Sequence, residues 1–196
     1  MSESPVLITK DARGVATVAI NRPQVRNAID DHVIHSLTDA FKTLGADGET
    51  RIVVLTGRGV AFSAGADLDW MRRMAAGREA ENLASAKTIS AMLRALNELP
   101  KPTIARVNGA AYAAGIGLVA ACDIVVAAED AVFSISEVRI GLVPSTLSPY
   151  VLAAIGARAA RRYFLTGSRF PPRTHADWVS CTKSLHRPAS TKRSRE

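Results

Sequence analysis

The stretch NGAAYAAGIGLVAACDI, residues 108–124, consists almost entirely of glycine, alanine and other apolar residues. It has no charged residue before Asp123, and it overlaps the end of a short apolar run, TIARVNG (residues 103–109), that reads as a buried strand. Small side chains allow another group to come close to the backbone, because no bulky side chain stands in the way. We therefore expect this stretch to bring backbone N–H groups to a ligand.

A second stretch of the same kind comes earlier in the chain. AFSAGADL, residues 61–68, follows the apolar run RIVVLTG at residues 51–57. In both places a Gly/Ala loop leads to the start of a helix, where the first N–H groups have no intrahelical partner. One such loop is a weak signal, since tight packing explains it about as often as anion binding does. Two such loops could place two N–H donors on a single oxyanion.

The rest of the chain alternates between strand and helix patterns. Asp30 is a good N-cap for a helix that Gly45 is expected to end. Continuously apolar strands that alternate with amphipathic helices indicate an α/β fold with a mainly parallel sheet. Strands are predicted at residues 6–11, 14–23, 51–57, 103–109, 123–130 and 131–136, and helices at 31–44, 69–76, 79–99, 148–156 and 158–167.

Composition predicts a protein with one core and no bound metal. The chain has 196 residues, of which 47% are hydrophobic, without an apolar run long enough for a membrane span and without a secretory signal pattern. Cys122 and Cys181 form no CxxC motif, so we expect a reducing, cytoplasmic environment. The histidines show no metal-ligand spacing, and neither a metal nor another cofactor is expected; they are His32, His35, His175 and His186.

The net charge of +7 invites a nucleic-acid interpretation, but its distribution argues against one. Residues 171–196 hold six Lys or Arg and two acidic residues, so this segment carries +4 of the total. The preceding part has no basic run with interleaved aromatic residues. A mildly basic surface suits a polyanionic small molecule equally well.

Three separated motifs resemble those of the enoyl-CoA hydratase/isomerase (crotonase) family. They are NRPQVRNAI at residues 21–29, AFSAGADLDWM at 61–71 and the long stretch from Val107 to Pro144, and the similarity runs from Val6 to Phe170. The resemblance implies a crotonase-like spiral of ββα units. It also implies an acyl-CoA thioester as substrate, a fold that closes with C-terminal helices, and assembly into a homotrimer or hexamer.

The resemblance also assigns roles to residues of the two loops. The N–H groups of Ala66 and Ala114 would form the oxyanion hole, and Asp67 reads as an N-cap that organises the backbone. The substrate would lie along Arg26, Ala28, Ala64, Gly65, Ala66, Asp67, Leu68 and Ala114.

Many hydratases of this family use two glutamates, and this chain has one of them. One position is occupied by Gly117 and the other by Glu137, to which the acid/base role falls. The alternative for Glu137 is a solvated glutamate at a strand end or at the N-terminus of a helix, which caps with Ser136. Glu129 and Asp130 read as surface charges in a turn.

Hydration of a 2-enoyl-CoA by one glutamate is the first interpretation of this pattern. Within the family, the sequence most resembles the methylglutaconyl-CoA hydratase branch, which implies a branched or carboxylated acyl chain. Because a single carboxylate can take a proton at one carbon and return it at another, double-bond isomerisation is the alternative.

From Pro171 the sequence becomes polar and basic, without periodicity. We expect a core domain at residues 1–170 and an atypical, disordered tail at 171–196 in place of the closing helices. Read one base out of frame from Ala176, the tail can encode Arg-Leu-Gly-Val-Val-His-Glu-Val, which resembles the family at this place. We therefore hypothesise a frameshift; the alternatives are a natural divergent tail, a non-catalytic remnant and a tail that binds nucleic acid.

Overall fold

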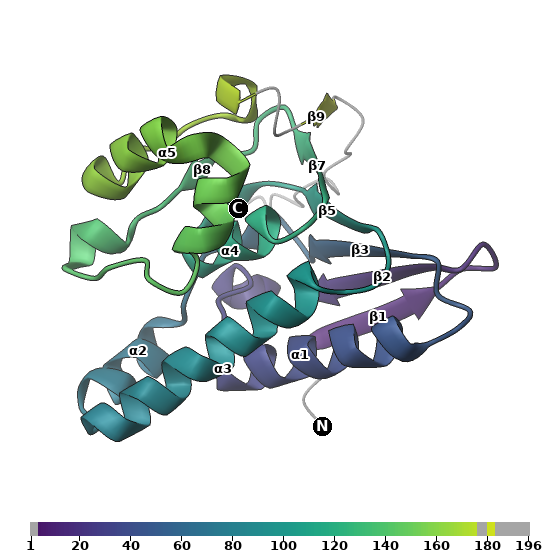
Figure 1. Ribbon diagram of the computed structural model, residues 1–196, viewed down its shortest axis with the longest axis horizontal. Helices are drawn as coiled ribbons and strands as arrows, with labels where there is room; N and C mark the ends of the chain where they lie inside the picture. Colours follow the sequence, from purple (N-terminus) through teal and green to yellow (C-terminus); the bar gives the residue numbers. More distant parts are fainter. Residues whose placement is uncertain (1–3, 176–179, 183–196) are drawn as a thin grey trace, which may run out of the picture.

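The computed structural model describes residues 4–175 and 180–182 and has the expected α/β architecture (Figure 1). A six-stranded sheet has the order β1-β2-β3-β5-β7-β9, and a three-stranded sheet has the order β4-β6-β8. The strands of the large sheet are β1 (Val6–Lys10), β2 (Val15–Ile20), β3 (Ile52–Gly57), β5 (Thr103–Val107), β7 (Ile124–Ala128) and β9 (Ser180–Thr182). Those of the small sheet are β4 (Ala61–Ser63), β6 (Ala110–Tyr112) and β8 (Phe133–Ser134).

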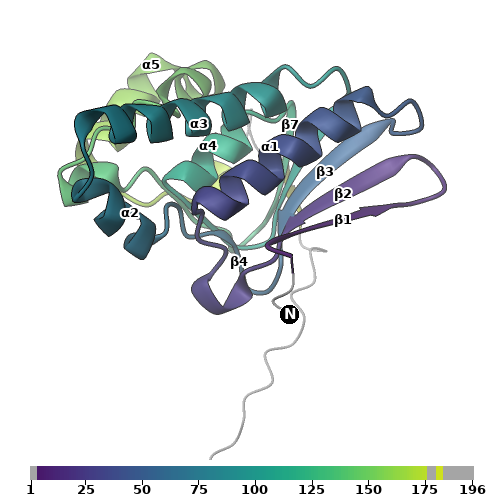
Figure 2. The same cartoon turned by 90° about the horizontal axis from the view of Figure 1, so that it is seen from below.

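Helices cover one side of the large sheet, where α1 and α3 lie over its strands (Figure 2). Strands β1 and β2 pair as an antiparallel hairpin, and every other pair in the two sheets is parallel. The helices are α1 (Asp31–Ala46), α2 (Leu68–Ala75), α3 (Glu79–Asn97), α4 (Ala114–Ala120) and α5 (Ser148–Thr166), and the 3₁₀ turns are η1 (Pro23–Val25), η2 (Glu137–Ile140) and η3 (Pro172–His175).

Helix α1 begins as the sequence predicts and ends later. The Asp30 carboxylate accepts a hydrogen bond from the Val33 N–H at 2.9 Å, which satisfies one of the free donors of the first turn. The prediction that Gly45 ends the helix is wrong, because the helix continues to Ala46 and Gly45 lies close to Pro100 inside it. Its apolar face is buried in the core, including Val33, Leu37, Phe41 and Leu44.

The small sheet was not predicted, because two of its three strands fall in segments that read as loops. Each strand of the small sheet follows a strand of the large sheet after a short connection. Within the small sheet, β4 pairs in parallel with β6, and β6 pairs in parallel with β8. Parallel pairing brings the ends of all three strands to the same edge. The two Gly/Ala loops and the segment that leads to Glu137 therefore start side by side.

The two helices predicted between residues 148 and 167 are confirmed as two segments of α5. Gly156, with φ 76° and ψ 159°, interrupts the helical geometry between them. Such a backbone conformation is open to glycine and strained for other residues.

The C-terminal segment is described only in part. Turn η3 and strand β9 follow residue 170, and β9 pairs in parallel with β7. Residues 176–179 and 183–196 lie outside the described residues, so the division at residue 170, the disorder of the tail and the frameshift remain predictions. Within the described ranges no helix is long and apolar enough to cross a membrane.

Candidate functional site

The two Gly/Ala loops are in direct contact. A Cβ atom added to Gly65, whose φ is +92°, would lie 2.8 Å from the Ala113 Cβ and 2.9 Å from the Tyr112 carbonyl oxygen. A Cβ on Gly115 would lie 2.8 Å from the Ser63 Cβ. These distances are too short for real side chains, so glycine is required at both positions. The loops approach each other here because their side chains are so small.

Hydrogen bonds fix the orientation of the peptide between Gly65 and Ala66. The Gly65 carbonyl accepts from the Ile29 N–H at 2.8 Å, and the Asp67 N–H donates to the Ile29 carbonyl at 2.9 Å. In a trans peptide the N–H points away from the carbonyl. The Ala66 N–H therefore points away from Ile29, and it donates to no acceptor among the described residues.

The peptide between Ala113 and Ala114 is arranged in the same way. The Ala113 carbonyl accepts from the N–H groups of Ile116, at 2.9 Å, and Gly117, at 3.3 Å, in the first turn of α4. The Ala114 N–H consequently points out of the helix, and within the described part of the chain it has no acceptor either. Both N–H groups that the family resemblance assigned to the oxyanion hole are thus free to bind a ligand.

Ala113 is held in a strained conformation beside this second N–H. Its φ of 47° and ψ of −120° lie in a region that glycine occupies easily and alanine does not. The Ala113 N–H donates to the Ser134 carbonyl at 2.9 Å, and the contact with Gly65 restrains the other side. Strained backbone of this kind is common at binding loops and costs about 1–3 kcal/mol.

Replacing Ala113 by glycine is expected to raise the free energy of unfolding by about 1 kcal/mol, because it removes this strain. Urea denaturation of the purified protein measures the change. The matched control is Ala153→Gly at an exposed position of α5, where glycine should lower the free energy of unfolding by about 0.5–1 kcal/mol. Equal destabilisation by both substitutions would show that Ala113 is not strained.

Glu137 follows the third strand of the small sheet. Residue Ser134 of β8 pairs with Tyr112 of β6, and three residues later Glu137 begins turn η2. This register places Glu137 just beyond the segment that is hydrogen-bonded to Ala113. The structure therefore brings the candidate acid/base residue and both Gly/Ala loops to the same edge of the small sheet.

The environment of the Glu137 carboxylate is unusual for a glutamate. Its Oε2 atom is buried and has no hydrogen-bond partner among the described residues, and the Ser136 side chain makes no capping hydrogen bond. Burial raises the pKa of Glu137 above its ordinary value of 4.5, although its own backbone N–H acts in the opposite direction. The alternative of a solvated glutamate capping with Ser136 is wrong.

The raised pKa of Glu137 makes protein stability depend on pH. Below the ordinary pKa the carboxyl is protonated in both states, and folded stability is lost as pH rises through the higher folded-state value. Glu137→Gln should therefore melt at a higher temperature than the wild type at about pH 8, and the difference should shrink toward zero at about pH 4. Calorimetry at both pH values measures this. A difference that does not change with pH would contradict the raised pKa.

Neighbouring side chains fill the space beside Gly117, the position where the family resemblance led us to look for a second glutamate. A Cβ on Gly117 would lie 2.8 Å from the Leu147 Cβ, and both Leu93 methyl groups would lie 3.5 Å from it. All three residues are buried. No glutamate could be accommodated here without moving α3 or the start of α5.

The predicted substrate-binding residues differ in their accessibility. Arg26 is exposed, with no ion-pair partner among the described residues, and Leu68 is 65% exposed. Ala28 is buried, with 8% of its surface exposed, and its carbonyl accepts from Arg22. Asp67 is confirmed as an N-cap, because its carboxylate accepts from the N–H groups of Asp69 and Trp70. Ala64 and Ala66 are half-buried, and Gly65 is buried.

An apolar groove of about 560 Å³ begins beside these loops. It extends from Leu68, two residues after Ala66, to Ile140 and Leu142, which follow Glu137. Helices α2 and α3 form its other wall (Figure 1). Of the residues that line this groove, only Leu68 was predicted to contact a substrate, because exposure of the other apolar residues is visible only in the structure. Its apolar lining includes Leu68, Trp70, Met71, Met74, Ile89, Ile140 and Leu142.

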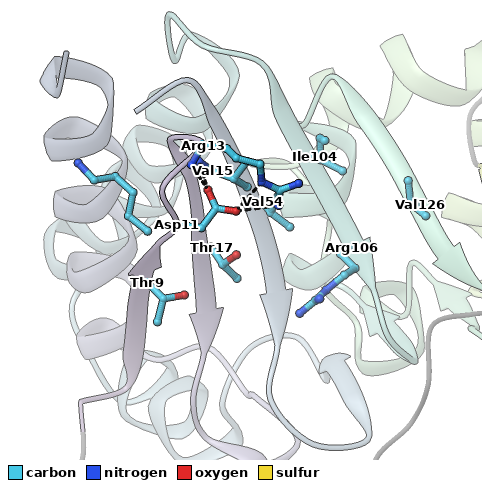
Figure 3. Close-up of a pocket in the computed structure, with 10 residues that line it drawn as sticks. Thr9, Asp11, Arg13, Val15, Thr17, Val54, Ile104, Arg106 and Val126 are labelled. Atoms are coloured by element: carbon cyan, nitrogen blue, oxygen red, sulfur yellow. Dashed lines mark hydrogen bonds and ion pairs between the residues drawn. The ribbon is translucent and has the colours of Figure 1, made fainter. Parts of the chain in front are cut away.

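A second hollow, of about 440 Å³, lies on a face of the large sheet (Figure 3). Asp11 and Arg13 in this hollow pair with each other at 2.7 Å, and Lys10 pairs with Asp47 and Glu49. The remaining charged side chain that lines the hollow, Arg106, is exposed and donates to the Thr56 hydroxyl at 3.4 Å, so the charged groups described here are either paired or open to solvent.

The remaining reactive side chains lie away from the two Gly/Ala loops in the sequence, and most of them are exposed. His32 and His35 are exposed on α1, as are Glu129 and Asp130 in their turn. Cys122 is a buried free thiol whose pKa burial raises to about 12. Among the described residues no group of three or more His, Cys, Asp or Glu could hold a metal ion.

Comparison with known proteins agrees with this geometry. The sequence profile of the family "Enoyl-CoA hydratase/isomerase" matches residues 10–179. A Thermus thermophilus protein named as a provisional enoyl-CoA hydratase is 42% identical over 153 residues, which are 78% of this chain and 60% of the relative. A hydroxycinnamoyl-CoA hydratase-lyase of Pseudomonas fluorescens is 35% identical over 160 residues, 80% of this chain and 58% of the relative. The chain thus spans less than two thirds of these relatives.

Solved structures show the same fold. An enoyl-CoA hydratase from Shewanella pealeana superimposes with a TM-score of 0.88 at 37% identity, covering 92% of this chain and 69% of that one. An enoyl-CoA hydratase from Mycobacterium smegmatis gives 0.87 at 37% identity, with 93% and 72% covered. With its crotonase-like fold and a family profile that matches most of its length, this chain belongs to the enoyl-CoA hydratase/isomerase family.

Proposed function

We propose that this chain catalyses the addition of water to the double bond of a 2-enoyl-CoA thioester. The observation that carries the proposal is the combination of a buried, unpartnered Glu137 oxygen with two free N–H groups on loops that touch. Buried polar atoms normally have partners, so a buried, unpartnered Glu137 oxygen at the same edge of a small sheet as two free N–H groups indicates a site that a ligand completes.

The two N–H groups have the function of an oxyanion hole in this proposal. When water adds to a 2-enoyl thioester, negative charge develops on the thioester oxygen as an enolate forms. Donors that are already fixed at this oxygen need no reorganisation during the reaction, and each contributes about 2.7–4 kcal/mol. The N–H groups of Ala66 and Ala114 are fixed in this way, since the carbonyl of each of their peptides is hydrogen-bonded on the opposite edge.

Glu137 has the acid/base function. As a carboxylate it takes a proton from the attacking water, and as a carboxylic acid it returns that proton to the α-carbon of the enolate. Burial raises the pKa of Glu137 above its ordinary value, which favours the carboxylic acid more than in an exposed glutamate and so assists return of the proton. Water adds across the double bond, and the product is a 3-hydroxyacyl-CoA.

Double-bond isomerisation is the second candidate, and the surroundings of Gly117 favour it. Leu147 and Leu93 occupy the space where a second glutamate would act, so one carboxylate serves both proton transfers. An isomerase needs only such a carboxylate and an oxyanion hole. Hydration differs in that a water molecule must be held beside Glu137.

The apolar lining of the groove favours a substrate whose acyl chain is a hydrocarbon, straight or branched. Arg72 alone is charged among the described residues that line it, and its guanidinium pairs with Asp69 at 2.7 Å. A carboxylated acyl chain, as in the methylglutaconyl-CoA branch, would have to displace this exposed pair. Exposed ion pairs contribute little to stability, typically below about 1 kcal/mol, so breaking this pair would cost little free energy.

Turnover assays with paired substrates test the proposal. The purified chain is incubated with a straight, a branched and a carboxylated 2-enoyl-CoA and with a 3-enoyl-CoA, and the products are identified by mass spectrometry. A product one water heavier from a 2-enoyl-CoA supports hydration. Conversion of the 3-enoyl-CoA at constant mass, without hydration, supports isomerisation.

The assay also addresses the alternative of a non-catalytic remnant. Several apolar side chains on and after η2 are exposed, including Val143 at 79%. A folded chain that neither converts these substrates nor melts at a higher temperature in their presence would favour the remnant. Sedimentation of the same sample shows whether it forms the trimer or hexamer that the family suggests, and the nucleotide sequence around codon 176 decides the frameshift hypothesis.

A further inference from the structure

Arg22 connects two segments that carry predicted substrate-binding residues. These segments are residues 21–29, to which Arg22 itself belongs, and residues 61–68. One terminal nitrogen of its guanidinium lies 3.0 Å from the Asp30 carboxylate and donates to the Ala28 carbonyl at 2.6 Å. The other lies 3.2 Å from the Asp67 carboxylate. Only 20% of the Arg22 side chain is exposed, and the two carboxylates are 14% and 15% exposed. Solvent therefore screens these pairs less than it screens surface pairs.

Both partners of Arg22 are helix caps. The Oδ1 atom of Asp30 accepts from the first turn of α1, and the Oδ1 atom of Asp67 accepts from the first turn of α2. Arg22 binds the Oδ2 atom of each. Its planar fork thus joins the starts of two helices, which a lysine ammonium on a flexible stem cannot do with the same geometry.

This junction lies next to one oxyanion donor. Asp67 directly follows Ala66, and its own N–H donates to Ile29. Burial alone would raise the pKa of Asp67, but the Trp70 N–H and the charge of Arg22 outweigh it and hold this pKa below its ordinary value. Asp67 is therefore a carboxylate when the enzyme works, and it restrains the peptide of Ala66 from its C-terminal side.

Resting on the function proposed above, we infer that Arg22 is a positioning residue, which holds the Ala66 N–H in line with the thioester oxygen through Asp67. It is not a substrate contact. Both of its terminal nitrogens are engaged, and one cation between two carboxylates leaves a net negative cluster that repels phosphate groups. The exposed Arg26, four residues later, has no ion-pair partner in the part of the chain that the structure describes, so we assign contact with the CoA phosphates to it.

Kinetics of four variants test this inference. Arg22→Lys and Asp67→Asn should each lower kcat about 10- to 100-fold and change KM less than about threefold, since a misaligned donor is lost mainly in the transition state. Asparagine is a good helix cap, so Asp67→Asn keeps α2 and removes only the charge. Arg13→Gln, at an exposed surface pair with Asp11, is the matched control and should leave kcat and KM unchanged, whereas Arg26→Gln should raise KM. Unchanged kcat in folded Arg22→Lys and Asp67→Asn would overturn the inference.

A second measurement separates this inference from the proposed function. If the wild type converts no enoyl-CoA, the proposed function fails and the kinetics cannot be compared. The NMR resonance of the Ala66 amide then gives the result, since it does not depend on activity. Displacement of this resonance in Arg22→Lys, with the Ala114 resonance unchanged, supports positioning by Arg22, and an unmoved Ala66 resonance overturns it.

Discussion

Replacing Glu137 by glutamine is expected to lower kcat by about 10³-fold, because the amide has nearly the shape of the carboxylate but can neither take nor return a proton. Affinity for an acyl-CoA should remain within about threefold, since the free N–H groups and the groove are unchanged. Steady-state kinetics with a 2-enoyl-CoA, combined with calorimetric titration of a saturated acyl-CoA, measure both quantities.

Glu129→Gln is the matched control for this experiment. Glu129 is exposed, eight positions earlier in the chain, and pairs with Arg173 on the surface. Its replacement should leave kcat and KM unchanged. Near-full activity of Glu137→Gln would remove Glu137 from the mechanism, and equal losses in both variants would indicate a general effect of charge.

Replacing Ala114 by proline is the second large effect that we expect, because proline has no N–H. Residue 114 is the first residue of α4, a position where proline is favourable in helices, but proline also restricts the conformation of the strained Ala113 before it, so circular dichroism must first identify a folded variant. Loss of one oxyanion donor should lower kcat by about 10²–10³-fold. Stopped-flow or steady-state turnover of a 2-enoyl-CoA measures the loss.

Ala114→Gly is the control for the proline substitution, because it changes the side chain and keeps the N–H. It should retain activity within about threefold, and both variants should unfold at similar temperatures. Retention of activity by a folded Ala114→Pro protein would contradict an oxyanion role for this N–H. Inactivity of both variants would show instead that the alanine methyl group is required.

Several parts of the fold could be predicted from the sequence because local chemistry determines them. The side chain of Asp30 caps the N-terminus of α1, as expected of an aspartate at this position. Gly156 interrupts α5 between the two helices that the sequence predicts. The small sheet could not be predicted, because strands of two or three residues have no measurable periodicity and depend on their partners. Helix α1 extends one residue beyond Gly45, and its C-cap is Asp47, whose N–H donates to the Thr43 carbonyl.

The candidate site was predictable to a different degree at each residue. The sequence showed that Gly117 carries no carboxylate, but only the structure shows Leu147 and Leu93 in its place. Glu137 stood in a segment with ordinary composition, and its burial comes from tertiary packing. Arg22 gave no signal of its own, since its two acidic partners lie 8 and 45 positions away in the chain.

The vibration of a bound thioester carbonyl tests the central claim most directly. An enoyl-CoA labelled with a heavy isotope at its carbonyl carbon is bound to Glu137→Gln, which should not convert it, and its infrared stretch is compared with that of the free thioester. Two N–H donors at the oxygen weaken the carbonyl bond, so a shift to lower frequency is expected, and adding Ala114→Pro should reduce this shift. A bound thioester whose carbonyl frequency equals that of the free molecule would contradict the oxyanion hole and with it the proposed chemistry.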